Sequence, residues 1–434
     1  MKVVILAGGK GTRMGDITTN MPKPMVLLNN KPILEHQIEL IKRYGLFEII
    51  ILIGYKGDVI KKYFGDGGSW GVKISYFSDP KPLGTAGSLK EIEDILSMPF
   101  LLLYGDTILD INLIELISFH EKKRGVATLV VHPNDHPHDS DLLDIDVNKK
   151  ITKFHSKPHR KELYHRNLVN AALYVLSPQI FKYITKNKYL DFGKDVFPYI
   201  LIKNKSIYGY NTTEYIKDIG TTDRLKEVEK DYITGKVKRL NKSNKQKAIF
   251  IDRDGVVNYE DNPLDTHSKF RLLPGVINAI KTINRSDYLA VLVTNQPIIA
   301  KGQATKKQVC QIHNYMEYIL GKEGVYFDRI YYCPHHPEKG FKNEIKKLKI
   351  DCECRKPKTG MVDLAVKEMN IDVKKSFIVG DRTVDIKMGI NAYLHTILIL
   401  QGYAGSDKKY ICKPDYTFLD LNEAVNFITF KFQN

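Results

Sequence analysis

At 434 residues the chain exceeds the usual size of one compact domain, so its length favours two. An apolar share of 43% and a charged share of 27% are ordinary for a soluble globular protein, and no run approaches the ~20 apolar residues that cross a membrane. A net charge of +16 fits either a nucleic-acid surface or a protein that serves polyanionic small substrates. The second class is favoured, because the basic residues are spread along the chain without an RNA-binding or recognition-helix motif.

The apolar start Met1–Ala7 turns into glycines too early for a signal peptide, whose apolar core needs ~7–15 residues. We therefore expect a cytoplasmic protein with small-molecule substrates and with neither a membrane nor a nucleic acid as partner. A homo-oligomer is compatible with the sequence, which does not fix the oligomeric state.

Short runs rich in Val, Ile and Leu recur between helical patterns. Such runs are typical of strands buried on both faces of a parallel sheet. The predicted strands span residues 3–7, 49–53, 100–104, 248–251, 289–293, 377–379 and 396–400. Several end in Gly, Asp or Asn, and open α/β sheets bind ligands at the carboxyl ends of their strands. The pattern predicts an α/β protein with its chemistry at these ends.

Residues 234–246 are basic, polar and almost free of apolar side chains, which is typical of a solvated linker. They separate a predicted first domain, residues 1–233, from a second, residues 247–434. Each part is long enough to bury its own core.

A glycine-rich turn, Gly8-Gly9-Lys10-Gly11-Thr12-Arg13, follows the first predicted strand. Glycines let the backbone approach phosphate oxygens closely, and exposed N–H groups there form an anion nest. The turn lacks the Gly-Lys-Ser/Thr ending of a P-loop, and Met14 stands where a dinucleotide fingerprint needs its third glycine. Lys23, in a rigid Pro-Lys-Pro stretch, and a second glycine loop at residues 83–88 support an anion site.

Together these motifs resemble those of the sugar-phosphate nucleotidyltransferases, over residues 1–232. The resemblance implies a Rossmann-like, GT-A-like doubly wound domain that joins a nucleoside triphosphate to a sugar 1-phosphate and releases pyrophosphate. The implied triphosphate contacts are Gly8, Gly9, Gly11, Thr12, Arg13 and Lys23, with Arg13 and Lys23 catalytic. The other implied contacts are Gly84 and Thr85 to the nucleoside, Asp106 and Asp218 to Mg²⁺, Lys157 and Lys194 to the sugar phosphate, and Asn170 to the sugar.

Such a transfer needs positioning and charge neutralisation but no covalent nucleophile, because the sugar phosphate attacks the α-phosphorus in line. The sequence departs from the family at Ser156, where Glu commonly precedes Lys-Pro. The usual carboxylate contact to the sugar hydroxyls is therefore missing, and sugar recognition is expected to differ.

The second half opens with Asp252-Arg253-Asp254-Gly255 directly after a predicted strand. Residues two apart in an extended segment point to the same side, so Asp252 and Asp254 can reach one phosphorus. Thr294-Asn295, Arg355-Lys356 and Gly380-Asp381 follow in order, with Asp385. This ordered set resembles the haloacid-dehalogenase-type (HAD) phosphatases from residue 247 to about residue 427.

By that resemblance the second domain is a HAD-like Rossmannoid fold in which Asp252 attacks the phosphoryl group. Asp254 protonates the leaving oxygen and then activates water. Magnesium is implied at Asp252, Asp381 and the backbone carbonyl of Asp254. The implied substrate contacts are Thr294, Asn295, Arg355 and Lys356.

Cys333, His335, Cys352 and Cys354 offer three soft sulfurs and one imidazole, a set that fits structural tetrahedral Zn²⁺. Such a site would pin the loop that carries Arg355 and Lys356. The spacing does not decide between His335 and His336; the family pattern favours His335.

This zinc loop with Cys-Arg-Lys-Pro resembles the heptose bisphosphate phosphatases, with histidinol-phosphate phosphatase as the nearest relative. Pro297 and Ile298 replace the usual Ser-Gly after Thr-Asn-Gln. The two halves together suggest a bifunctional enzyme that removes the 7-phosphate of D-glycero-D-manno-heptose 1,7-bisphosphate and activates heptose 1-phosphate, with GTP favoured, as a GDP-heptose for a surface glycan. The alternatives are a mannose- or glucose-type transferase fused to a histidinol-phosphate-type phosphatase, and a non-catalytic sensor domain that regulates the phosphatase.

Overall fold

The computed structural model describes residues 1–434 except 10, 12–13, 16–17, 20, 79–81, 160–162, 262 and 433–434. Its contacts divide the chain into two units. The first comprises Met1–His132, Ser140–Lys157 and Leu168–Asn241, and the second comprises Pro133–Asp139, Pro158–Asn167 and Lys242–Asn434. The division falls between Asn241 and Lys242, inside the stretch expected to be a linker.

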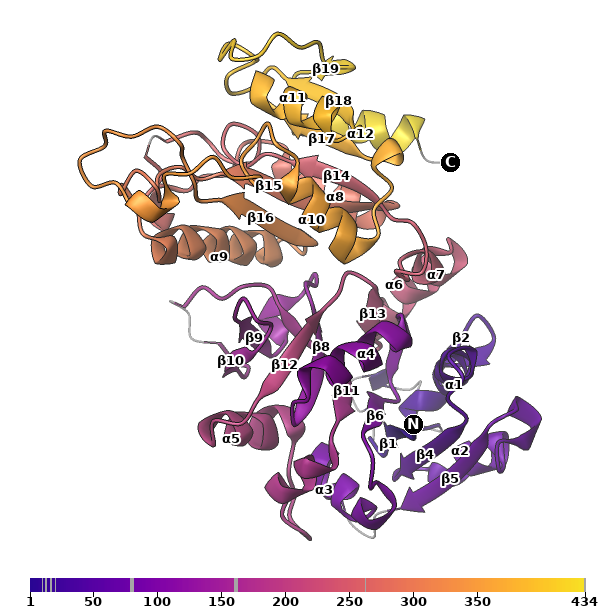
Figure 1. Ribbon diagram of the computed structural model, residues 1–434. Helices are drawn as coiled ribbons and strands as arrows, with labels where there is room; N and C mark the ends of the chain where they lie inside the picture. The colour runs from indigo at the N-terminus through magenta and orange to yellow at the C-terminus, as the bar shows by residue number, and fades with distance from the viewer. Residues whose placement is uncertain are drawn as a thin grey trace. The chain divides into compact units, whose positions relative to one another are not determined.

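The strands of the first unit build one large mixed sheet and two small ones (Figure 1). The large sheet has the order β10-β9-β11-β6-β1-β4-β5, with β8 paired to β11 and to β12. The bounds of the strands are β1 Val3–Ala7, β2 Leu27–Leu28, β3 Lys31–Pro32, β4 Glu48–Ile53, β5 Lys73–Ser78, β6 Phe100–Tyr104, β7 Thr107–Asp110, β8 Ala127–His132, β9 Leu142–Ile145, β10 Ile151–His155, β11 Val169–Leu176, β12 Ile207–Asn211 and β13 Tyr215–Asp218.

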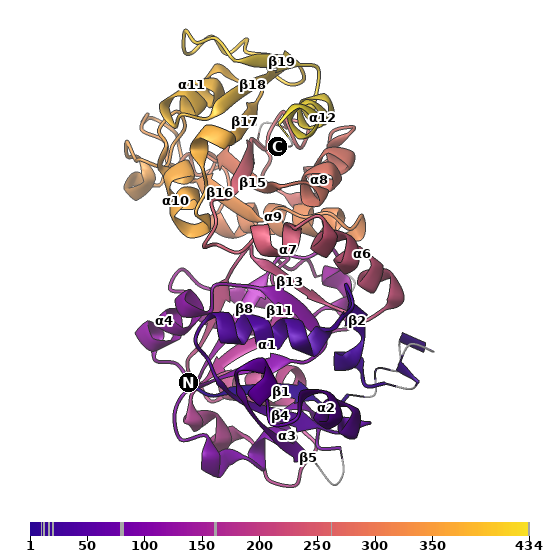
Figure 2. The ribbon, with the colours of Figure 1, turned by 90° about the vertical axis from the view of Figure 1, so that its right-hand side faces the viewer.

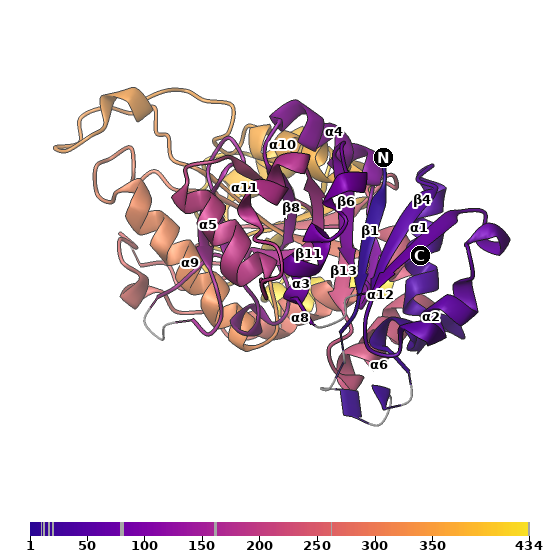
Figure 3. The ribbon, with the colours of Figure 1, turned by 90° about the horizontal axis from the view of Figure 1, so that it is seen from below.

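Helices cover both faces of this sheet, as expected for a doubly wound domain. Alternate residues of β1 enter opposite cores, since Val3 and Ile5 pack with α1, α2 and α4, whereas Val4 packs with α3 and α5. The parallel strands β6, β1 and β4 lie side by side in Figure 3. The helices are α1 Ile33–Arg43, α2 Gly57–Phe64, α3 Gly84–Lys90, α4 Leu113–Lys123, α5 Phe197–Ile202, α6 Thr222–Ile233 and α7 Lys236–Arg239.

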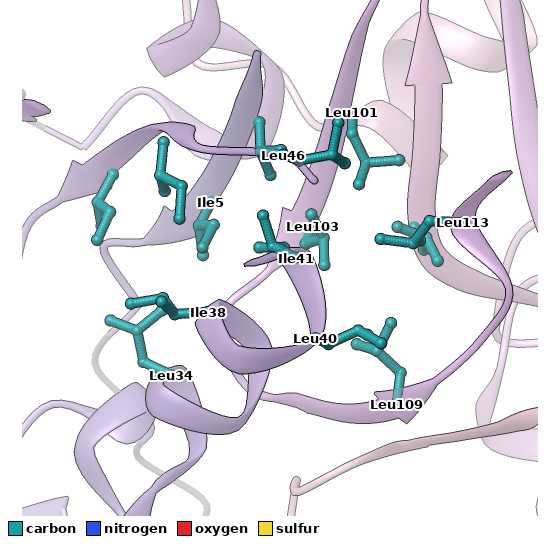
Figure 4. Packing of buried hydrophobic residues seen from close by; sticks show 14 of the residues in the cluster. Ile5, Leu34, Ile38, Leu40, Ile41, Leu46, Leu101, Leu103, Leu109 and Leu113 are labelled. Carbon is teal, nitrogen blue, oxygen red and sulfur yellow. The ribbon is translucent and has the colours of Figure 1, made fainter. Parts of the chain in front are cut away.

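Helix α1 shows how the core positions a site. Its apolar residues Leu34, Ile38 and Ile41 recur at helical spacing and pack with Ile5 of β1 (Figure 4). On the same helix, Gln37 is 1% exposed, and its side-chain amide donates hydrogen bonds to the carbonyls of Tyr104 (2.8 Å) and Thr107 (2.7 Å). The turn between β6 and β7, which carries Asp106, is thereby fixed to the core.

The stretch expected to be solvated contains the short helix α7, and its residues up to Asn241 belong to the first unit. Val237 is buried in an apolar cluster with Val228 and Tyr215. Asn241 is also buried, and its side-chain amide donates to the carboxylate of Asp110 at 2.6 Å. Val237 and Asn241 were not predicted to be buried, because most other side chains of the segment are polar.

The second unit contains a six-stranded parallel sheet in the order β16-β15-β14-β17-β18-β19. Figure 2 shows α10 and α11 on one side of this sheet, and α8 and α12 on the other. The elements are β14 Lys247–Ile251, β15 Tyr288–Asn295, β16 Arg329–Cys333, β17 Phe377–Gly380, β18 His395–Ile399, β19 Tyr416–Phe418, α8 Val276–Arg285, α9 Lys306–Lys322, α10 Gly360–Met369, α11 Thr383–Asn391 and α12 Leu421–Lys431.

Two segments from the first half of the sequence belong to the second unit and pack on α9. The ring of Tyr164 lies 4.8 Å from that of Tyr315 and 5.0 Å from that of Tyr318, measured between centroids. The backbone carbonyl of Tyr164 accepts a hydrogen bond from Asn314 at 3.2 Å. The second unit therefore includes residues 133–139 and 158–167, which lie in the sequence between segments of the first unit.

Among the helices that the structure describes, none combines the length and apolar character needed to cross a membrane.

Candidate functional site

The first unit has a pocket of about 660 Å³ at the carboxyl ends of β1 and β6. Seven of the residues expected to bind the nucleotide or its metal line this pocket, namely Gly8, Gly9, Gly11, Lys23, Gly84, Thr85 and Asp106. The expected contacts Thr12 and Arg13 lie outside the described residues.

Gly11 brings the glycine loop against Lys23. It has a φ of +65°, and a Cβ at this position would lie 3.2 Å from the Cβ of Lys23, so a larger residue would be strained and crowded. The ammonium of Lys23 reaches the Asp106 carboxylate at 2.5 Å, and the Lys23 side chain is 9% exposed. A largely buried cation thus pairs directly with a carboxylate in the pocket lining, and these are the two kinds of group that can bind phosphates and a divalent cation.

Backbone pairing holds Asp218 next to the turn that carries Asp106. Asp218 pairs with Thr107 across β13 and β7, and the Ile219 N–H donates to the Asp106 carbonyl at 2.9 Å. Its two carboxylate oxygens accept hydrogen bonds from the Arg224 guanidinium at 3.0 and 2.9 Å. The shared Mg²⁺ site of Asp106 and Asp218 stays a prediction. Arg224 was not predicted, since a pair six residues apart, across the start of α6, has no simple sequence signature.

The second glycine loop holds the segment that carries Lys194. A Cβ on Gly84, whose φ is +77°, would overlap the carbonyl oxygen of Leu190. The Thr85 hydroxyl donates to Asp191 at 2.8 Å, and Asp191 in turn accepts from the Lys194 N–H at 3.1 Å. Sequence analysis missed Asp191, which links the nucleoside loop to a predicted sugar-phosphate residue.

Asp141 joins the other predicted sugar contacts. Its side chain accepts from the Lys157 N–H at 3.1 Å, and its backbone carbonyl accepts from the Asn170 N–H at 3.0 Å. The Asn170 side-chain amide donates to the Tyr174 hydroxyl at 3.0 Å, whereas its oxygen is buried without a hydrogen-bond partner among the described residues. Lys157 and Asn170 are thus linked by the side chain and the backbone carbonyl of Asp141, a residue that belongs to no predicted motif.

The second unit has a pocket of about 390 Å³ at the carboxyl ends of β14 and β15. Its lining includes most of the residues predicted for phosphoryl transfer, namely Asp252, Asp254, Thr294, Asn295, Arg355 and Lys356.

Lys356 lies at the centre of a buried charge cluster. Its ammonium is 2.8 Å from Asp252 and 2.6 Å from Asp385, and it donates to the Val293 carbonyl at 3.1 Å. Burial alone would lower the pKa of Lys356, but the carboxylates of Asp252 and Asp385 outweigh it and raise this pKa. The lysine stays charged beside the predicted nucleophile.

Three buried carboxylates, Asp252, Asp381 and Asp385, place oxygens within 4.8 Å of one another. Burial and the nearby Asp252 charge raise the pKa of Asp381 to about 8 and that of Asp385 to about 7. One Asp381 oxygen is buried and has no hydrogen-bond partner in the part of the chain that the structure describes. Hard oxygen ligands with excess negative charge fit Mg²⁺, and the set adds Asp385 to the predicted ligands Asp252 and Asp381.

Gly255 makes room for this cluster. Its φ is +84°, and a Cβ there would overlap the Asp381 carboxylate. The glycine after the two aspartates is therefore required for both its backbone conformation and its missing side chain.

Asp254 is held by three neighbours. Its carboxylate accepts from Arg253 at 2.9 Å, from Asn258 at 3.0 Å and from Gln296 at 2.8 Å. Burial would raise the pKa of Asp254, but Arg253 and the hydrogen bonds outweigh it and lower this pKa. The two predicted catalytic aspartates thus have different environments, with a lysine beside Asp252 and an arginine beside Asp254.

Asn295 fixes the backbone of the Lys356 loop. Its side-chain oxygen accepts from the Lys356 N–H at 3.1 Å, and its amide donates to the Lys356 carbonyl at 3.3 Å. Thr294 is buried and accepts from Gln296 at 2.9 Å. The predicted phosphate contacts therefore also support one another.

Cys333, His335, Cys352 and Cys354 converge on one point. Their sulfurs are 3.3 to 3.5 Å apart, and Nδ1 of His335 lies 3.3 Å from the Cys354 sulfur. Zinc at ~2.3 Å from each sulfur would separate the sulfurs of a regular tetrahedron by about 3.8 Å, close to this spacing. A hydrogen bond from Cys333 lowers the pKa of Cys354 to about 5, which favours the thiolate that binds metal.

The same cluster distinguishes the two histidines. His335 belongs to it, whereas His336 lines the phosphatase pocket. The Arg355 guanidinium donates to the His335 carbonyl at 3.1 Å. The geometry thus connects the candidate zinc centre to a predicted substrate contact.

Comparisons with known proteins divide the chain in the same way. Residues 2–235 match the nucleotidyl transferase family, and residues 353–424 match a HAD-hydrolase-like family. A mannose-1-phosphate guanyltransferase of Kluyveromyces lactis is 34% identical over 57% of this chain and 66% of its own length, so the chain spans less than two thirds of that relative.

A D-glycero-beta-D-manno-heptose-1,7-bisphosphate 7-phosphatase of Haemophilus influenzae is 44% identical over 34% of this chain and 77% of its own length. Among solved structures, HddC from Yersinia pseudotuberculosis complexed with GMP-PN is 25% identical with a TM-score of 0.47, over 53% of this chain and 99% of that one. The chain is therefore a fusion, a member of the nucleotidyl transferase family in its first half and of the heptose-bisphosphate 7-phosphatase family, with a HAD-like domain, in its second.

Proposed function

We propose that the chain catalyses two consecutive steps toward a nucleotide-activated heptose. The second domain would hydrolyse the 7-phosphate of heptose 1,7-bisphosphate, and the first would transfer a nucleotidyl group to the resulting heptose 1-phosphate. The observation that carries the proposal is the fusion itself, since a heptose-bisphosphate phosphatase homologue shares its chain with a nucleotidyl transferase. The product of one reaction class is the substrate of the other.

In the phosphatase step, Asp252 attacks phosphorus and forms an aspartyl-phosphate while Asp254 protonates the leaving sugar oxygen. Lys356, beside Asp252, neutralises charge on the phosphoryl oxygens. Asp254 then takes a proton from water, which hydrolyses the intermediate. Magnesium, when bound at Asp252, Asp381 and Asp385, supplies charge that offsets repulsion between the attacking carboxylate and the phosphate.

In the transfer step, the sugar phosphate attacks the α-phosphorus and pyrophosphate leaves. Lys23 lies in the pocket beside Asp106, where its charge can stabilise the triphosphate as negative charge shifts to the leaving group. Lys157 and Lys194 would hold the attacking phosphate. Magnesium, when bound at Asp106 and Asp218, would screen the phosphates and Lys23 would remain their direct partner.

GTP is the favoured nucleotide and a GDP-heptose for a surface glycan the favoured product. The guanyltransferase relative supports this base, but the acceptor in its name is mannose 1-phosphate. Mannose 1-phosphate is therefore the second candidate acceptor. The two acceptors share the manno ring and differ in the side chain beyond C5, so sugar contacts rather than phosphate contacts would decide between them.

Phosphorus NMR of the full chain tests the proposal directly. The mixture contains Mg²⁺, either anomer of heptose 1,7-bisphosphate and equimolar nucleoside triphosphates. We expect inorganic phosphate, pyrophosphate and one nucleotide-sugar diester. With the bisphosphate as substrate, Asp252→Asn should abolish the inorganic phosphate signal. With heptose 1-phosphate as substrate, Lys23→Met should abolish the signals of pyrophosphate and of the nucleotide-sugar diester.

The controls separate the two domains. Phosphate without a diester would refute the transferase assignment for this sugar, and mannose 1-phosphate in the same assay would then test the second acceptor. Nucleotide binding without pyrophosphate from any sugar phosphate would favour a sensor domain.

A further inference from the structure

Arg253, between the two catalytic aspartates, has its guanidinium fully buried and every nitrogen engaged. Nε and Nη2 donate to Asp254 at 3.1 and 2.9 Å, and Nη2 also donates to Gln296 at 3.0 Å. Nη1 points away from the carboxylate and donates to Nε2 of His313 at 3.0 Å. The arginine is thus clamped between the predicted acid/base and a histidine.

His313 comes from α9, which carries none of the motifs that predict the phosphatase. It is 5% exposed, and its ring contacts that of Tyr332 at a centroid distance of 5.4 Å. Burial and the Arg253 charge lower the pKa of His313 to about 3, so the ring is neutral and its Nε2 can accept. An arginine has no acceptor of its own, and a protonated histidine could not serve here.

We propose that His313 is a positioning residue for the phosphatase reaction, because it fixes the Arg253 guanidinium that orients Asp254. The inference rests on the proposed phosphatase function and on the acid/base role of Asp254. Without an acceptor at position 313, Nη1 would be a buried donor of a charged group with no partner. The guanidinium would then rotate to find one, and its two-point contact with Asp254 would weaken.

This role predicts a particular kinetic signature. Asp254 gives its proton to the leaving oxygen during formation of the aspartyl-phosphate, and because Arg253 lowers its pKa it must regain that proton from the attacking water in each turnover. A strongly basic leaving group depends on that proton, whereas a weakly basic phenolate leaves without it. A misplaced Asp254 should therefore slow poor leaving groups more than good ones, and a purely structural defect should slow all of them alike.

The test uses the full chain with Mg²⁺ and a series of substituted phenyl phosphates of rising phenol pKa. The variants are His313→Leu, which removes the acceptor, and His313→Gln, which keeps one. Ile312→Ala is the matched control, since Ile312 is the preceding residue of α9 and its side chain lies in the apolar core. The readout is the slope of log kcat/KM against phenol pKa, which reports only steps up to phosphorylation of Asp252.

For His313→Leu we expect a steeper negative slope, with kcat/KM reduced on the order of 100-fold for the most basic phenol and under about 10-fold for the least basic, within the range of general acid catalysis. His313→Gln should restore most of the slope. Ile312→Ala should lower thermal stability and leave the slope unchanged.

An unchanged slope in His313→Leu would overturn the inference, as would an equal loss in His313→Gln. If the unaltered chain hydrolyses phenyl phosphates but not heptose bisphosphate, only the proposed sugar substrate fails and the slopes still decide the role of His313. If it hydrolyses neither, both proposals fall.

Discussion

Lys356→Met should be the most damaging single substitution in the second domain outside its two proposed catalytic aspartates, Asp252 and Asp254. The side chain of Lys356 is 1% exposed, and its ammonium lies 2.8 Å from the Asp252 carboxylate and 2.6 Å from the Asp385 carboxylate. Methionine has a similar length but no charge, so two buried carboxylates would lose their cation. Breaking a buried pair by removing one partner typically costs ~3–5 kcal/mol.

Lys358→Met is the matched control two residues away. Lys358 also pairs with two carboxylates, Asp351 at 2.9 Å and Glu353 at 3.2 Å, but its side chain is 34% exposed. Solvent-exposed pairs contribute only about 0–1 kcal/mol. The two variants therefore remove the same charge from the same loop and differ in burial.

Two measurements decide the outcome. Hydrogen exchange of the amides in β14 and β17, without Mg²⁺, should report a local unfolding free energy lowered by ~3 kcal/mol or more in Lys356→Met and by less than ~1 kcal/mol in Lys358→Met. The phosphatase kcat/KM, with Mg²⁺, should fall by about 100-fold or more only in Lys356→Met. Equal protection in the two variants, or full activity of Lys356→Met, would refute the reasoning from burial.

Three further predictions concern the metals and the transferase. Because burial raises the pKa of Asp381 to about 8, its ionised form destabilises the folded domain. Without Mg²⁺, the protection of the β17 amides against hydrogen exchange should therefore fall as the pH rises from about 4 to about 8. Added Mg²⁺ should abolish this pH dependence. Chelation of zinc at constant Mg²⁺ should release the Arg355 loop and lower phosphatase activity, and added Zn²⁺ should restore that activity. Nucleotidyl transfer should not change. Retained phosphatase activity in a metal-free Cys354→Ser chain would contradict a structural zinc. Lys23→Met should reduce pyrophosphate release by about 100-fold while phosphate release stays unchanged, and an equal effect on both would contradict two separate sites.

Much of the fold could be predicted because its central strands are buried on both faces. The runs at residues 3–7 and 100–104 coincide with β1 and β6, and the predicted strand 248–251 lies within β14. The antiparallel strands β9 and β10 were not predicted, because their partial exposure interrupts the apolar runs. The strands β8 and β11 were not predicted either, although they are largely buried. The helix α7 was missed because two anchors in a polar segment give no periodic signal.

The site shows a similar division. Motif residues such as Asp252 and Lys356 could be found because local spacing carries their chemistry, and the structure brings them together. Asp141 and His313 could not, since each acts through a partner distant in the chain. Asp141 and His313 are identified by the residues they contact in the structure and not by a local sequence motif.

The discontinuous second unit limits how the two enzymes could be separated. A protein cut at the boundary between Asn241 and Lys242 would lack residues 133–139 and 158–167, which complete that unit. The aromatic side chains of Tyr315 and Tyr318 would then lose the ring of Tyr164 and present an uncovered apolar patch to water. An isolated phosphatase made in this way would be prone to self-association, so a separated second domain would need residues 133–139 and 158–167 as well as residues 242–434.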